Sequence, residues 1–158
     1  MNRMKKICAG LLLLAFCFSA LPQAMAKDDK EAEVRAALAK FVQAFDNLDW
    51  ETFRASFADN ATVFHPRQFA RRVEGRAGVE ETFKQVFVRI KGDKTSPPYM
   101  DLQPKDLQIQ LAGDQVAIAT FHLDDRPGFL NRRTIVLQKI ERTWKIIHIH
   151  ASEVADTH

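Results

Sequence analysis

The sequence contains very little cysteine, and the positions of its two cysteines exclude thiol chemistry from most of the chain. Of 158 residues only Cys8 and Cys17 are cysteines, and both lie in the first 26 residues. A chain without that segment has no disulfide, no thiol nucleophile and no thiolate metal ligand. Glycine and proline are also scarce, at six each, which excludes a collagen-like or low-complexity chain. The fold must therefore be stabilised by an apolar core.

The longest uninterrupted apolar run lies at the N-terminus. Three basic residues within residues 1–6 precede ICAGLLLLAFCFSAL at 7–21, and PQAMA follows at 22–26. A positive start, an apolar stretch short for a bilayer and an Ala-x-Ala exit are typical of a secretory signal peptide. We therefore expect cleavage after Ala26, export to the periplasm or the extracellular space, and no membrane attachment of the mature chain. An uncleaved membrane anchor is the alternative.

The excess of positive charge belongs to this first segment. The whole chain has 23 Lys and Arg against 20 Asp and Glu. Because residues 1–26 contain three of these cations and no acid, residues 27–158 carry 20 charges of each sign. This balance removes the electrostatic argument for nucleic acid binding. The length of residues 27–158 suits a single domain.

Residues 27–158 are predicted to begin with helices. Apolar side chains recur at helical spacing from Val34 to Leu48. Asp49 is a suitable N-cap for a short second helix over Trp50 to Phe57. A third apolar stripe from Val79 to Ile90 predicts another helix, and a strand over 61–65 separates the two.

From residue 102 onward the apolar period changes to two. Strands are expected over 102–111, 116–123, 132–140 and 144–152, joined by short turns. Helices that come mostly first, followed by consecutive strands, predict an α+β fold with a curved, largely antiparallel sheet.

Two arginines open the third of these strands. Because side chains alternate along a strand, either Arg132 or Arg133 faces inward. A guanidinium in a cavity can anchor a carboxylate or a phosphate. We favour Arg132, which shares a face with Thr134 and Val136. The alternative is a solvated strand start paired with nearby acidic residues.

Histidines are the candidate acid–base groups. Even-numbered residues from Trp144 to Ser152 are expected to share one half-buried face, which places His148 beside His150. His65, at the end of the first strand, could act as a general base, since imidazole titrates near neutral pH. His122 could be a further polar partner. The alternative for all of them is a structural hydrogen bond in a polar wall.

Neither a metal nor a cofactor is predicted. The His-x-His pair of the last strand could ligate a metal only with a third ligand, and no Cys or carboxylate cluster accompanies it. The sequence contains no Gly-rich phosphate loop and no nucleophile elbow. Tyr99 is the single tyrosine, so it is the only phenol that a site could use.

Several segments carry a resemblance to a known family. They are FDNLD at 45–49, FADNATV at 57–63, EGR at 74–76, RRT at 132–134 and WKIIHIHAS at 144–152. Together they resemble the nuclear transport factor two-like superfamily. More closely, they are similar to its SnoaL-like branch and to the association domain of calcium/calmodulin-dependent kinase.

The resemblance implies a cone-shaped fold in which a curved sheet wraps the first helix and leaves a pocket at the open end. Dimers through the sheet are common in such families. Some members are ketosteroid isomerases, dehydratases, polyketide cyclases or epoxide hydrolases, and many others only bind ligands or assemble. In the kinase-association relatives, arginines and a histidine line a pocket suited to small carboxylates. By position Arg132 and His150 correspond to these, although Ala151 stands where that relative has an arginine.

These observations predict an exported, homodimeric, SnoaL-like domain that binds a small polar or anionic molecule. The first alternative is an enzyme of the isomerase, dehydratase or cyclase type with a histidine acid–base group. The second alternative is a dimeric assembly module. The expected ligand-binding residues are Arg132, His122, His148, Tyr99 and Ser152, and the expected catalytic residues are His65 and His150.

Overall fold

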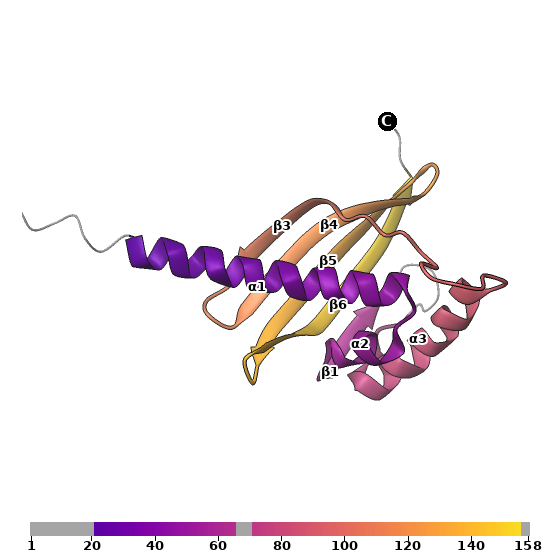
Figure 1. The fold of residues 1–158 in the computed structure, drawn as a ribbon, viewed down its shortest axis with the longest axis horizontal. Coiled ribbons are helices and arrows are strands. Elements are labelled where there is room, and N and C mark those ends of the chain that lie inside the picture. Colours follow the sequence, from indigo (N-terminus) through magenta and orange to yellow (C-terminus); the bar gives the residue numbers. More distant parts are fainter. Residues whose placement is uncertain (1–20, 66–70, 156–158) are drawn as a thin grey trace, which may run out of the picture.

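The computed structural model describes residues 21–65 and 71–155, which form helices on a single sheet (Figure 1). The predicted α+β class is confirmed. The elements in chain order are α1 (Leu21–Asp46), α2 (Trp50–Ala55), β1 (Phe57–Phe64), β2 (Val73–Glu74), α3 (Gly75–Lys91), β3 (Lys105–Leu111), β4 (Val116–Arg126), β5 (Phe129–Ile140) and β6 (Thr143–Ala155).

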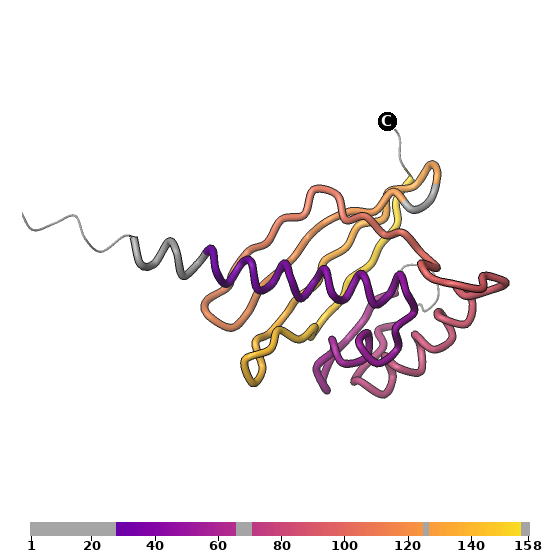
Figure 2. Tube along the Cα trace, in the orientation of Figure 1, coloured from indigo at the N-terminus to yellow at the C-terminus, as the bar shows by residue number. Residues whose placement is uncertain are grey.

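The sheet has the strand order β2-β1-β6-β5-β4-β3. β1 runs parallel to β6, and all other neighbours are antiparallel, so the sheet is mixed. Figure 1 shows α1 crossing one face of the sheet, with α2 and α3 gathered at the β1 end. The trace in Figure 2 follows the long strands as they curve around α1. This arrangement is the predicted cone, and its inner face is the side that contacts α1.

A cluster of phenylalanines joins the helices to the sheet, and Phe53 of α2 lies at its centre. The ring of Phe53 is fully buried. Its centroid lies 4.9 Å from those of Phe83 and Phe87 on α3, 5.2 Å from that of Phe57 on β1 and 5.4 Å from that of Phe41 on α1. A helix of six residues is unstable by itself, so α2 exists because it buries this ring.

The predicted N-cap of α2 is present, but the predicted end of this helix is wrong. The carboxylate of Asp49 accepts a hydrogen bond from the backbone N–H of Thr52 at 3.1 Å. The helix ends at Ala55, and Phe57 begins β1 instead of completing the helix. The reason is long-range, since the N–H of Ile146 donates to the carbonyl of Ser56 at 2.8 Å and draws this segment into the sheet.

The N-terminal helix extends upstream of the expected start of the mature chain. α1 begins at Leu21, before the predicted cleavage site after Ala26. The other residues of the predicted signal peptide, 1–20, lie outside the described residues. Within 21–65 and 71–155, the structure contains no helix with the length and apolar character needed to cross a bilayer.

Replacement of Phe53 by alanine should cost about 3 to 5 kcal/mol of unfolding free energy, because it leaves a cavity between three helices and β1. Urea denaturation of the purified protein measures this loss. The matched control is Val88→Ala on the outer side of α3, where the side chain is 76% exposed, and we expect a change within about 0.5 kcal/mol. Equal losses in both variants would contradict the central role of Phe53.

Candidate functional site

A β-bulge in the last strand determines which of its side chains face the cone. β5 and β6 pair Leu137 with Ile146, and the next pair is Val136 with His148. One step on β5 therefore corresponds to two on β6, and Ile147 is the extra residue. A bulge of this kind shifts the alternation of side chains by one position.

The bulge reverses the predicted facing of the C-terminal half of β6. Trp144 and Ile146 are buried before the bulge, whereas Ile149 and Ala151 are buried after it. The prediction that the even-numbered residues from Trp144 to Ser152 share one half-buried face is therefore wrong. The side chains that the bulge turns to the outer face of the sheet are His148, His150 and Ser152.

Arg133, not Arg132, is the arginine of β5 that enters the cone. Arg133 lines the inner cavity, as do its register partners Phe121 on β4 and Ala151 on β6. Arg132 is exposed on the opposite face. The preference for Arg132 as the inward-facing anchor is therefore wrong.

The predicted alternation of side chains along β5 is correct, but the prediction of which face is buried is wrong. Arg132 does share a face with Thr134 and Val136, as predicted. The larger apolar side chains of the strand, Ile135 and Leu137, are on the other face and are only 1% exposed. Burial of the more apolar set selects the inner face, and Arg133 goes with that set.

Most of the predicted ligand-binding residues do lie close together, but on the outer face. Arg132 is paired with His122 on one side and with Ser152 on the other. His150, two residues before Ser152 on β6, pairs with Thr134. These groups form a polar surface that is separated from the cavity by the sheet itself.

His148 is the most constrained group on this outer face. Its Nδ1 lies 2.7 Å from the hydroxyl oxygen of Thr62 on β1, and the ring of Phe64 packs edge-on against the imidazole. The pKa of His148 is lowered below its ordinary value. Partial burial is the main cause, and the positive charges of His150 and Arg72 add to it. The environment of this histidine therefore favours the neutral imidazole over the charged one.

Tyr99 lies in the connector between α3 and β3 and does not line the inner cavity. Its backbone N–H donates to the carbonyl of Asp46 at 2.7 Å, and the next N–H, of Met100, donates to the same oxygen at 3.2 Å. These backbone hydrogen bonds attach the connector to the end of α1. Its neighbour Met100 is the residue that reaches the cavity.

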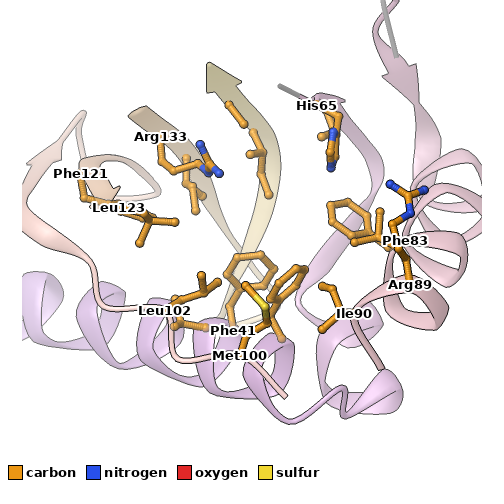
Figure 3. Close-up of a pocket in the computed structure, with 17 residues that line it drawn as sticks. Phe41, His65, Phe83, Arg89, Ile90, Met100, Leu102, Phe121, Leu123 and Arg133 are labelled. Carbon is orange, nitrogen blue, oxygen red and sulfur yellow. The ribbon is translucent and has the colours of Figure 1, made fainter. Parts of the chain in front are cut away.

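A cavity of about 290 Å³ lies between α1, α3 and the inner face of the sheet. Its walls are mostly apolar, and its nitrogen-bearing side chains are His65, Arg89 and Arg133. Figure 3 shows His65 and Arg133 at the side away from α1, and Phe41 with Met100 at the side next to α1. The cavity therefore has a cationic end and an apolar end.

His65 is the predicted site residue that the cavity contains, and Arg89 is the one that sequence reasoning missed. The ring of His65 packs against that of Phe83, with centroids 6.3 Å apart. Arg89 follows Val86 by three positions and so lies on the same side of α3 as the residues that face the cavity. This helical spacing was the signal that could have identified it.

The guanidinium groups and the imidazole determine what the cavity could hold. In the described ranges 21–65 and 71–155, no cluster of three or more His, Cys, Asp or Glu side chains could hold a metal ion. Guanidinium groups form charge-assisted, often bidentate hydrogen bonds with carboxylates and phosphates. A neutral imidazole can accept or donate a proton beside them.

The pKa of His148 should be found below 6.5 by NMR titration, and His150→Gln should raise it by removing a neighbouring positive charge. In the wild type, a lowered pKa means that near this pH the folded protein binds fewer protons than the unfolded chain. The free energy of unfolding should therefore fall as the pH drops through the pKa that His148 has in the unfolded chain. His122→Gln, which removes a histidine not among the causes of the shift, is the control. An ordinary or raised pKa for His148 would contradict this placement.

Comparison with known proteins places this geometry in a family. A family model described as a SnoaL-like domain matches residues 34–157. An NTF2-like protein of unknown function from Pseudomonas putida is 21% identical, with a TM-score of 0.67 over 83% of this chain and 91% of that chain. A candidate dehydratase of the NTF2-like family from Streptomyces avermitilis is 19% identical, with a TM-score of 0.66 over 80% and 97%.

An assembly domain shares the fold as well. The association domain of C. elegans CaMKII is 17% identical, with a TM-score of 0.61 over 81% of this chain and 98% of that chain. At these identities the structural likeness shows the fold alone, whereas the family model covers most of the sequence. The chain belongs to the SnoaL-like domain family.

Proposed function

We propose that this SnoaL-like protein binds a small amphipathic anion inside its cone, with Arg133 as the main anchor. The observation that carries the proposal is the division of the cavity into a cationic end and an apolar end. A volume of about 290 Å³ is at the lower limit of small-molecule pockets, so the ligand is small.

The cationic end favours a carboxylate or another compact anion. Arg133 and Arg89 come from different elements, β5 and α3, and both line the cavity with His65. The guanidinium groups would attract a negatively charged ligand, and its apolar part would contact the phenylalanines near α1.

We further propose that the protein acts outside the cytoplasm. The support is the N-terminal pattern of residues 1–26, with its basic start, apolar stretch and Ala-x-Ala exit. The absence of cysteine from residues 27–158 is compatible with an oxidising compartment, since no thiol would be exposed there.

Acid–base catalysis is the second candidate function, and the position of His65 favours it. His65 lines the cavity together with Arg133, so a proton acceptor and a cation border the same space. A base beside a cation that polarises a carbonyl is suited to isomerisation or dehydration. His150 lies on the other face of the sheet, so it has no part in this proposal.

A homodimer through the outer face of the sheet completes the proposal. The association domain among the structural neighbours supports it, and half-buried Val136, Ile118 and Phe64 add apolar surface to that face. Val136→Asp should then give a monomer in native mass spectrometry, whereas Arg133→Ala should leave the dimer intact. A wild-type monomer at micromolar concentration would contradict the dimer and leave ligand binding to be judged separately.

Arg133→Ala should weaken the binding of octanoate, a probe with one carboxylate and an apolar chain, by roughly tenfold or more, because a hydrogen bond to a charged group is lost. Isothermal titration calorimetry measures the change. Arg132→Ala, the adjacent arginine on the outer face, is the matched control and should bind as the wild type does. Equal effects of the two substitutions would refute Arg133 as the anchor.

His65→Ala separates the two candidate functions. If the protein only binds its ligand, this variant should keep octanoate affinity within a few-fold, because Arg133 remains. If the protein is an enzyme, the variant should lose turnover of the substrate while it still binds. A screen of hydroxy and keto acids by NMR, with the wild type and His65→Ala in parallel, provides the measurement.

A further inference from the structure

A second hollow adjoins the cone cavity on the side of α1. It has a volume of about 590 Å³ and lies between α1 and the segment that leads from Pro98 to Leu107. Three residues line both spaces: Val42 of α1, Met100 of the connector and Phe121 of β4. The two hollows are therefore back to back, and these three side chains are the partition between them.

The partition combines two fixed side chains with one adaptable side chain. Val42 and Phe121 belong to regular elements, and Phe121 is buried. Met100 lies in an irregular connector and is half-buried. Methionine is unbranched, with three rotatable bonds, so it can change shape at low cost. Movement at Met100 is therefore the simplest way to join the two spaces.

Asp46 anchors the backbone of this connector. Its carbonyl accepts the N–H of Tyr99 and that of Met100, and its carboxylate accepts the N–H of Leu102 at 3.1 Å. The backbone of Met100 is thus held at both sides while its side chain can rotate. Opening of the partition does not require the connector to detach from α1.

The chemistry of the outer hollow suits a hydrocarbon chain and not a second anion. Leu38, Ala39 and Leu107 contribute apolar surface to it. The carboxylates of Asp46 and Asp101 border the same space, and burial followed by the charge of Asp101 raises the pKa of Asp46. Arg35 also lines the hollow, but its guanidinium is paired with Glu31 at 2.7 Å. Methylene groups would gain there by leaving water.

We propose that Met100 sets the length of the ligand, and that the outer hollow is a subsite for the tail of a longer amphipathic acid. This inference rests on the proposed function, because it takes the carboxylate to be held at Arg133. Figure 3 shows Met100 near α1, away from Arg133, which is where the tail of such a ligand would end. An acid that fits the cone ends at Met100, and a longer one reaches the outer hollow only when this side chain moves or is removed.

The test is a series of straight-chain carboxylates, from butanoate through hexanoate, octanoate and decanoate to dodecanoate, titrated into the purified protein by calorimetry. In the wild type each added methylene should tighten binding about fourfold until the chain reaches the partition, after which the gain should stop. In Met100→Ala the gain should continue into the longer acids, because the tail enters the outer hollow.

Two control variants distinguish removal of the partition from mere enlargement. Ile90→Ala removes a similar volume from the cone cavity but does not border the outer hollow, so it should move the length limit less than Met100→Ala does. Met100→Leu retains a side chain of similar size and should keep the wild-type limit. Val42→Ala opens the partition from α1 and serves as a second test if Met100→Ala is poorly folded.

The outcomes separate this inference from the proposed function. If the wild type binds these acids and depends on Arg133, but Met100→Ala and Val42→Ala keep the wild-type limit, the partition model is wrong. The same conclusion follows if Ile90→Ala moves the limit as far as Met100→Ala does. If the wild type binds none of the acids, or binds them equally without Arg133, the proposed function itself fails.

Discussion

One extra residue in β6 determines which chemistry reaches the inside of the cone. Trp144 and Ile146 belong to the buried surface of the sheet, and without the bulge at Ile147 the next inward side chain would be His148. With the bulge, Ile149 takes that place and the apolar surface continues. Because burial of apolar area is the dominant favourable term in folding, the bulge both completes the core and moves the histidines to the outer face.

The cavity depends on this apolar inner surface and on the aromatic cluster that positions its walls. Phe53 holds α1, α3 and β1 at fixed separations, so α3 can present Arg89 and β5 can present Arg133 to one space. The cations lie at the side away from α1, and apolar side chains occupy the side next to it. The division of the cavity into a cationic and an apolar end is thus a consequence of how the sheet curves around α1.

The two faces of the sheet carry different side chains. The inner face, with Arg133, lines the cavity. The outer face carries Arg132 and His150. Neighbouring arginines in one strand therefore lie on different surfaces, because alternate side chains point to opposite faces.

The sequence by itself determined the element order, the α+β class, the N-cap at Asp49 and the alternation that separates Arg132 from Arg133, since each follows from local periodicity and capping. Tertiary structure alone decided which face of β5 is buried, where β6 bulges, and that Met100 stands between two hollows. These features depend on contacts between residues far apart in the chain. The period of a strand predicts which of its side chains share a face. Which of the two faces is buried depends on how the strand packs against the rest of the protein.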